Sequence, residues 1–475
     1  MKWRKRLEKD PSFTNAVKNL TKMTIPCLEQ NNTMDMFEHY FKEEEPEHLP
    51  ESLYMKTVAL FKDPAEEKRS VTKIGWHPEG PTKLVASYSN LRFQRMSEEM
   101  PTSSFVWDVT ERNMPVTELR TNSPLICCQY NHKNPDTLVG GCYNGILNFY
   151  DLRKGPSPAL KSTVEISHYD PVYDAIWLQS KTGTECASVS SDGRLLFWDV
   201  RNMSETTDEL GLTDGGKEEP KTIGGVSLEW MQEAGPTKFL VGTEHGLILA
   251  ASRKPKKPVE LGTWFGQEER GGYGRHFGPV YAVKRNPFHP KFFLSVGDWC
   301  AKMWMEELKG PMLQTPYYPS FLTAAAWSPT RAGVFFLCRQ DGRLDTWDYF
   351  YRMNEVSLSQ KISEASLTTL SVQSAGSFTA VGDADGCVTL MQLCDGLVQP
   401  GPNEKNLLGQ IFDRETKREK NLEAIKKLSG NKKEEKDARG SVGIDQETYQ
   451  AREKAFFAEV GMTGDDLGTS LPSGK

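Results

Sequence analysis

A run of apolar residues that ends in an aromatic residue recurs along the central part of the chain. A turn with glycine comes first in five of the seven copies, and an aspartate follows the aromatic residue in four of the seven. The closing positions are Trp107, Tyr150, Trp198, Ala251, Trp304, Trp347 and Met391, which are 43 to 53 residues apart. A repeat of about 45 residues with Trp-Asp is typical of the four-stranded blades of a WD40 β-propeller. Seven copies therefore predict an all-β fold with seven blades.

The last repeat indicates how the ring of blades closes. It offers strands near residues 367–372, 378–381 and 388–393, but the glycines and prolines of residues 396–402 follow where a fourth strand is due. Residues 53–61, ahead of the first complete repeat, alternate in the manner of a strand. We expect this segment to complete the last blade, because closure removes exposed sheet edges. The alternative is a stray strand packed outside the ring.

Helical patterns precede and follow the propeller, which we place at residues 53–398. Residues 1–52 predict helices that break at Pro26, and residues 399–475 predict a charged tail, helical or disordered, that is either solvated or paired with a partner. The insertion at residues 202–221 is expected to be a flexible loop. The helical patterns depend on Phe13, Val17, Leu20, Met34, Phe37 and Phe41 in the first segment, and on Leu408, Ile411, Phe412, Leu422, Ile425 and Leu428 in the last.

Composition excludes several classes of protein. The chain has 475 residues, of which 37% are apolar, and a net charge of -6, which does not favour nucleic-acid binding. No apolar run approaches the roughly 20 residues of a membrane span, and the basic start lacks the apolar stretch of a signal peptide. Nine cysteines without Cys-x-x-Cys spacing indicate reduced thiols rather than disulfides or a zinc site. We expect no cofactor.

The third repeat contains a histidine, a serine and an aspartate that could be interpreted as a catalytic site. His168, Ser190, Asp192 and Trp198 are spaced as in the hydrogen-bonded tetrad that stiffens propeller blades. A hydrolase is the competing interpretation, but the chain has no nucleophile elbow, so we favour the structural tetrad. The fifth repeat keeps part of this set, in His276, Asp298 and Trp304. The fourth and seventh repeats have lost the aromatic residue, which predicts irregular blades.

Two further segments invite a binding function. Residues 211–218 nearly match a phosphate-binding loop, but Glu218 stands where magnesium requires Ser or Thr, and acidic neighbours would repel phosphate. We therefore expect no nucleotide site and no enzyme. The basic run Arg253, Lys254, Lys256 and Lys257 is interpreted as a solvated loop.

Large aromatic residues near the predicted blade rims are better candidates for contacts with a partner. The set comprises Tyr143, Tyr169, Tyr173, Tyr281, Trp299 and Phe321, which fall close to turns and loops that propellers gather on one face. Aromatic residues at loop level are typical binding anchors. Several must instead pack between blades, so we expect no more than half to be contacts.

Longer runs carry a resemblance to a known family. They read LVGGCYNG at 138–145, HYDPVYDAIWLQSKTGTEC at 168–186, FLVGTEHG at 239–246, SVGDW at 295–299 and AWSP at 326–329. These runs resemble the intermediate chains of axonemal dynein, in particular those of the outer arm, and the resemblance extends from Val17 to the helix at 415–420. They are far more specific than Trp-Asp alone.

The resemblance implies a non-catalytic subunit of the outer-arm dynein motor of cilia and flagella. It implies that the propeller grips the helical tail of a dynein heavy chain beside a second intermediate chain, that assembly occurs in the cytoplasm, and that the subunit meets microtubules through the complex in the axoneme. The aromatic set named above would supply the heavy-chain contacts. The alternative function is a general propeller adaptor, for cytoplasmic dynein cargo or for ligase substrates.

The sequence argues against binding of dynein light chains by this chain. In the family they bind a long N-terminal extension, and this chain begins close to the helices that follow that extension. A Thr-Gln-Thr element, which would add a strand to a light-chain dimer, is also missing. We therefore expect a shortened paralogue, an isoform or an incomplete gene model.

Overall fold

The computed structural model describes most of the chain and divides it into two compact units, residues 1–53 and 54–475. Described are residues 2–32, 53–80, 82–91, 100–111, 114–213, 221–231, 237–253, 262–265, 274–308 and 310–440, with side chains of the last helix up to Ile425. The predicted positions Met34, Phe37, Phe41 and Leu428 have no described side chains, and the first three lie outside the described residues altogether.

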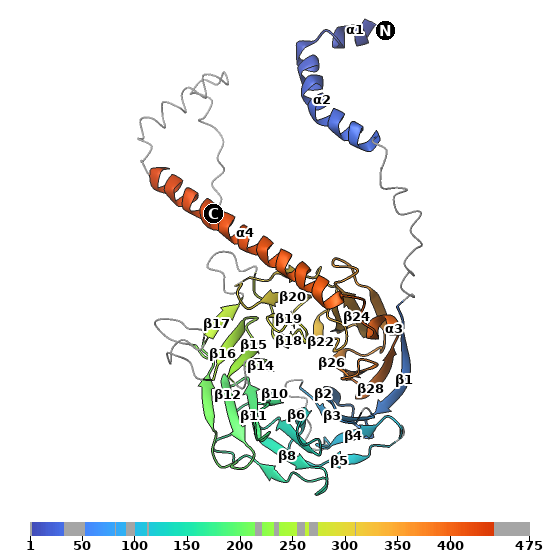
Figure 1. The fold of residues 1–475 in the computed structure, drawn as a ribbon, viewed down its shortest axis with the longest axis vertical. Helices are drawn as coiled ribbons and strands as arrows, with labels where there is room; N and C mark the ends of the chain where they lie inside the picture. Colours follow the sequence, from blue (N-terminus) through green and yellow to red (C-terminus); the bar gives the residue numbers. More distant parts are fainter. Residues whose placement is uncertain are drawn as a thin grey trace, which may run out of the picture. The chain divides into compact units, whose positions relative to one another are not determined.

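The second unit is a ring of seven four-stranded antiparallel sheets, which confirms the predicted fold class (Figure 1). Each blade runs from an inner strand at the ring centre to an outer strand at the rim. Blade one has β2 (Ser70–Trp76), β3 (Lys83–Ser89), β4 (Ser104–Asp108) and β5 (Thr117–Leu119); blade two has β6 (Leu125–Tyr130), β7 (Thr137–Cys142), β8 (Leu147–Asp151) and β9 (Leu160–Lys161); blade three has β10 (Val172–Trp177), β11 (Glu185–Ser190), β12 (Arg194–Asp199) and β13 (Asp208–Gly211).

The later blades repeat this order. Blade four has β14 (Gly225–Trp230), β15 (Lys238–Thr243), β16 (Ile248–Ser252) and β17 (Gly262–Phe265); blade five has β18 (Val280–Arg285), β19 (Phe292–Gly297), β20 (Cys300–Met305) and β21 (Leu313–Gln314); blade six has β22 (Leu322–Trp327), β23 (Val334–Arg339), β24 (Arg343–Asp348) and β25 (Leu358–Lys361). Blade seven combines β26 (Leu367–Val372), β27 (Phe378–Asp383) and β28 (Cys387–Leu393) with β1 (Met55–Lys62).

The pairing of β1 with β28 confirms the predicted ring closure. The strands run antiparallel from Met55 opposite Leu393 to Lys62 opposite Cys387, so a segment ahead of blade one forms the outer strand of blade seven. Phe61 points inward, is fully buried and lies 5.4 Å from the ring of Trp107 in blade one. The strand therefore joins the two ends of the ring through packing as well as backbone hydrogen bonds.

Two expectations about the blades are wrong. Blades four and seven are regular four-stranded sheets, because Ala251 and Met391 are buried at the aromatic position and pairing depends on the backbone. The predicted loop at 202–221 contains β13, the outer strand of blade three. Polar side chains suit that strand, since Leu210 is the only buried residue among its four.

The helices also differ from expectation. The first unit contains α1 (Lys2–Leu7) and α2 (Pro11–Asn32), and α2 continues through Pro26 where a break was predicted. A proline removes one backbone donor and kinks a helix, but the flanking hydrogen bonds can persist. The apolar positions Phe13, Val17 and Leu20 of α2 are exposed.

The last helix, α4 (Glu404–Gly440), follows the short α3 (Asp395–Val398), and its first turns pack on the propeller. Leu408 and Phe412 are fully buried in the core of blades five and six, and the Phe412 ring lies 4.7 Å from that of Phe292. The buried Arg331 pairs with Asp348 at 2.8 Å and with Glu404 at 3.0 Å. The prediction of a solvated or partner-bound helix is therefore wrong for this half, since the partner is the propeller itself.

Candidate functional site

The tetrad of blade three is present, but Ser188 occupies the place predicted for Ser190. His168 Nδ1 lies 3.0 Å from a carboxylate oxygen of Asp192, and its Nε2 lies 2.8 Å from Ser188 Oγ. The same Ser188 oxygen accepts the Trp198 indole N–H at 2.8 Å. Ser188 and Ser190 have the same parity on β11, so alternation alone cannot separate them. Ser190 sits at the turn, where its Oγ accepts the backbone N–H of Asp192 at 3.4 Å, too far along the strand to reach the indole.

Blade five contains a complete tetrad rather than the predicted partial one. His276 Nδ1 lies 3.1 Å from Asp298, while Ser295 Oγ lies 2.7 Å from both His276 Nε2 and the Trp304 indole nitrogen. Burial lowers the pKa of His276 despite the neighbouring carboxylate. Burial alone would raise the pKa of Asp298, but the hydrogen bond from His276 and further donors hold it at about 2.

Neither tetrad has the geometry of a hydrolytic site. Each serine hydroxyl is fully buried and wedged between an imidazole and an indole, so no substrate can reach it. In blade five, His276, Asp298 and Cys300 present possible metal-ligand atoms within 4.8 Å of one another. Both ring nitrogens of His276 are already hydrogen-bonded, and the buried Lys302 adds a competing positive charge nearby. Each tetrad is therefore an internal hydrogen-bond network that links the loop entering a blade to its second and third strands.

The tetrads also position exposed aromatic residues, which links them to the candidate binding surface. The carboxylate of Asp192 accepts the backbone N–H of Tyr169 at 3.1 Å, and that of Asp298 accepts the backbone N–H of Phe277 at 2.9 Å. Tyr169 and Phe277 are 75% and 62% exposed. Phe277 was not predicted, although its place directly after the histidine of a tetrad is the same as that of Tyr169 in blade three.

All six predicted aromatic residues lie at the same end of the blades. They lie in turns between the second and third strands, in loops that enter an inner strand, or at the second residue of an inner strand. Because the strands of a blade are antiparallel, all these positions lie at one face of the ring, which we call the entry face. Tyr169, Tyr281, Trp299 and Phe321 are exposed, whereas Tyr143 and Tyr173 are half-buried. The rings of Trp299 and Phe321 stack 4.6 Å apart.

A β-bulge in every inner strand turns one side chain toward the ring centre. The register shifts at the second residue of six inner strands and at the third residue of β2, so this residue is unpaired and points into the channel instead of into a blade. The seven bulged residues are Thr72, Ile126, Tyr173, Val226, Tyr281, Thr323 and Thr368. They form the mouth of a central channel of about 1220 Å³ on the entry face.

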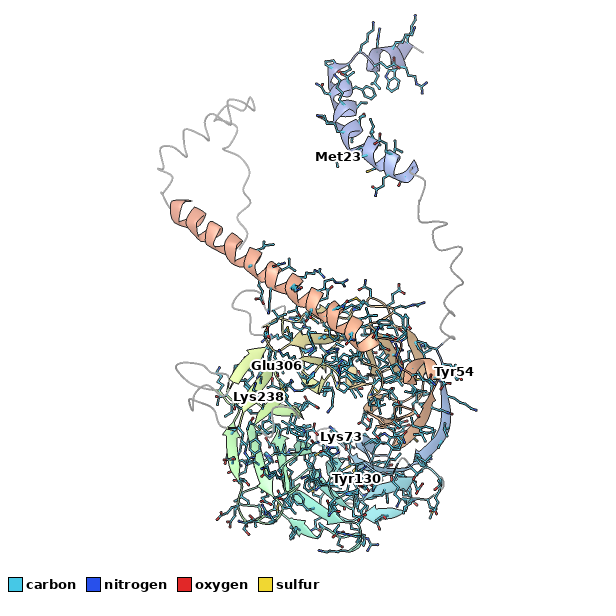
Figure 2. All side chains as sticks on the ribbon, in the orientation of Figure 1. Met23, Tyr54, Lys73, Tyr130, Lys238 and Glu306 are labelled. Atoms are coloured by element: carbon cyan, nitrogen blue, oxygen red, sulfur yellow. The ribbon has the colours of Figure 1, made fainter. Side chains whose placement is uncertain are left out.

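Paired charges line the channel below this mouth. Lys73, labelled in Figure 2 on the inner strand of blade one, reaches Asp174 of blade three at 2.9 Å. Lys284 of blade five binds Glu229 of blade four at 2.7 Å. Burial would lower the pKa of Lys284, but Glu229 and Asp174 raise it, so the lysine stays charged.

Comparisons with known proteins identify the family. Residues 225–393 match the model described as the WD40 domain of dynein axonemal intermediate chain 3. The 70 kDa intermediate chain of the flagellar outer-arm dynein of Chlamydomonas reinhardtii is 42% identical over 463 residues, which cover 96% of this chain and 80% of that protein. The chain belongs to the axonemal dynein intermediate chain family.

Two further relatives agree. Dynein intermediate chain 3, ciliary, of Heliocidaris crassispina is 43% identical over 93% of this chain and 73% of its own length. Human dynein axonemal intermediate chain 2 is 42% identical over 97% of this chain and 77% of its own length. The predicted resemblance and the expected axonemal location are confirmed. Among the described helices of this intermediate chain, none has the length and hydropathy that a membrane crossing requires.

The remaining predicted segments contribute little to the site that the structure describes. Gly211 ends β13, and residues 214–220, which contain Lys217 and Glu218, lie outside the described residues. The guanidinium of Arg253 is bound by Glu185 and Asp208, so this residue does not belong to a solvated basic loop. Lys254, Lys256 and Lys257 lie outside the described residues.

Sequence reasoning missed a second set of aromatic residues that holds the blades together. Three inner strands end in a tryptophan that is hydrogen-bonded to the neighbouring blade. Its indole N–H donates to the backbone carbonyl of the next-to-last residue in the inner strand of the preceding blade. Trp76 donates to Ser371 at 3.1 Å, Trp177 to Gln129 at 3.1 Å and Trp327 to Lys284 at 3.0 Å. The recurrence of tryptophan at the end of an inner strand was the sequence signal for this set, and it is separate from the Trp-Asp pattern of the third strands.

Proposed function

We propose that this intermediate chain is a non-catalytic scaffold of the axonemal outer-arm dynein, and that the entry face of its propeller binds the helical tail of a dynein heavy chain. One observation carries the proposal: large aromatic residues are exposed together at this end of the blades. Tyr169, Tyr281, Trp299 and Phe321 remain open to solvent within a folded ring. Large apolar side chains that are exposed in a cluster mark binding surfaces.

The stacked pair Trp299 and Phe321 is the strongest anchor in this set. Their rings are held face to face at 4.6 Å before any partner arrives, so little side-chain entropy remains to be lost on binding. Trp299 lies in the turn between β19 and β20, and its backbone carbonyl accepts the N–H of Tyr318. Aromatic anchors of this kind dominate the binding energy of interfaces.

The remaining partners follow from the family. The named relatives are subunits of a flagellar outer arm and of ciliary and axonemal dynein. The proposed complex contains a second intermediate chain, is assembled in the cytoplasm and meets microtubules through the whole motor. The part of α4 beyond the propeller, where Leu422 and Ile425 are exposed, is proposed to reach a neighbouring subunit. Light chains stay outside the proposal.

Capture of a purified heavy-chain tail fragment by the full chain tests the proposal. The double variant Trp299→Ala/Phe321→Ala should weaken capture strongly, since interface anchors commonly contribute about 2 kcal/mol or more each. Tyr54→Ala removes an exposed aromatic ahead of β1 and serves as the matched control. Charge reversal at Lys256 and Lys257 should do little. Loss of capture in the lysine variant, with capture retained by the aromatic variant, would show that the entry face is the wrong surface.

A further inference from the structure

Three tyrosines from blades two, three and five border one sector of the channel mouth. Tyr143 lies in the turn between β7 and β8, while Tyr173 and Tyr281 are the bulged residues of β10 and β18 and line the channel. Tyr281 is 47% exposed and the other two are half-buried. Within the described ranges, none of the three phenol oxygens has a hydrogen-bond partner in the protein. Rings and hydroxyls are therefore available to a ligand.

Two carboxylates share this sector. Glu244 lies in the turn of blade four, between the blades that carry Tyr173 and Tyr281, and Asp170 is exposed in the loop that enters β10. The backbone N–H of Gly224 donates to Glu244 Oε1 at 3.1 Å and fixes this carboxylate at the mouth. Burial raises the pKa of Tyr173, and Tyr143, Tyr281, Asp170 and Glu244 raise it further, so all four act on the same ring.

Three of the positive charges that the structure describes near this sector are bound to other groups. Lys73 and Lys284 are paired with Asp174 and Glu229 deeper in the channel. Arg194 covers the ring of Tyr169 at 4.9 Å and pairs with Glu209 at 2.7 Å. His245 lies beside Glu244, with 3.7 Å between its Nδ1 and the carboxylate, and is exposed. Arg275 is exposed in the loop that enters β18, and the sector itself, as far as the structure describes it, presents aromatic faces and the carboxylates of Asp170 and Glu244.

We propose that this sector, which we call the tyrosine mouth (Tyr143, Asp170, Tyr173, Glu244 and Tyr281), receives a lysine or arginine side chain of the bound partner. A cation is attracted to the faces of tyrosine rings, and the attraction grows when a carboxylate shares the desolvated site. The inference rests on the proposed function, because the partner is the heavy-chain tail, and it adds that the segment inserted at the mouth is basic. An acidic segment would be repelled.

A peptide assay tests the recognition without the heavy chain. The probe is a fluorescent alanine-rich helical peptide with three arginines, and the matched probe has glutamine at the same three positions. The full chain should bind the arginine peptide in preference, and added salt should weaken this binding. Tyr173→Ala/Tyr281→Ala and Glu244→Gln should each weaken it about tenfold. Tyr173→Phe/Tyr281→Phe should retain most of it, because the ring faces remain, and Tyr54→Ala should bind as the parent chain does.

Several outcomes would overturn the tyrosine mouth. Equal binding of the two peptides, or an affinity for the arginine peptide that is unchanged by Glu244→Gln, shows that no cation is recognised there. If Trp299→Ala/Phe321→Ala abolishes capture of the heavy-chain tail while the arginine peptide does not bind, the proposed function stands and the mouth is wrong. If the arginine peptide binds through the tyrosine mouth while no aromatic variant changes capture of the heavy-chain tail, cation recognition at the mouth is supported and the heavy chain binds elsewhere.

Discussion

Replacement of Phe61 by alanine tests ring closure at a single side chain. Phe61 is fully buried on β1, packs 5.4 Å from Trp107 of blade one and belongs to the core cluster shared by blades seven and one. Truncation of a buried phenylalanine costs about 3 to 5 kcal/mol in lost burial and cavity formation. That is a large share of the roughly 5 to 15 kcal/mol that stabilises a typical domain. Urea unfolding of the full chain, followed by tryptophan fluorescence, measures the loss.

Leu60 provides the matched control on the same strand. It pairs with Thr389 of β28 but is 54% exposed, since successive side chains of a strand face opposite ways. Leu60→Ala should therefore change the free energy of unfolding by about 0.5 kcal/mol or less. Deletion of residues 1–62 should expose the edge of β28 and produce an aggregating protein. A truncated chain that stays monomeric and as stable as the full chain, or a Leu60 variant as damaged as the Phe61 variant, refutes the closure argument.

Three further predictions concern the tetrads and the expectation that the chain binds no nucleotide. Ser188→Ala leaves a ring nitrogen of the buried His168 and the indole N–H of Trp198 without their shared partner and should destabilise the chain by about 2 kcal/mol or more in urea unfolding, whereas Ser190→Ala should cost clearly less. Because the folded-state pKa of Asp298 is depressed to about 2, its contribution to stability is present above its unfolded value near pH 4 and is lost as pH falls toward 2. Asp298→Asn should flatten that acid limb, and a limb of unchanged slope would contradict the assignment. Finally, the purified chain should show no saturable ATP binding in calorimetry at micromolar concentrations, and binding that Lys217→Ala abolishes would disprove this.

The seven-bladed architecture was predictable because local and periodic features of the sequence determine it. The spacing of the Trp-Asp copies indicated seven blades, and the glycines and prolines after residue 393 showed that the last blade needed a strand from elsewhere. Both signals can be recognised in the sequence without any knowledge of tertiary contacts. The loss of aromatic residues at Ala251 and Met391 misled the prediction, since a buried aliphatic residue preserves the strand as well as an aromatic one does.

Features that depend on register were not predictable. Ser188 and Ser190 share a face of β11, and the choice between them is made by how far along the strand the Trp198 indole reaches. The seven bulges arise from pairing between strands, so Tyr173 and Tyr281 were identified as rim residues without any indication that both turn into the channel. The docking of Phe412 required a hydrophobic surface assembled from two blades.

Helix α4 packs on the end of the propeller opposite the entry face. Its buried side chains meet residues of the connections between first and second strands, such as His289 and Ala332, and between third and fourth strands, such as Met312. Because successive strands alternate in direction, these connections lie at the end of each blade opposite the turn that carries Trp299. A helix fixed there by Glu404 and Phe412 can extend toward one neighbour without blocking the other end of the ring. The two proposed contacts, with a heavy-chain tail at the entry face and with another subunit along α4, are therefore sterically compatible on one propeller.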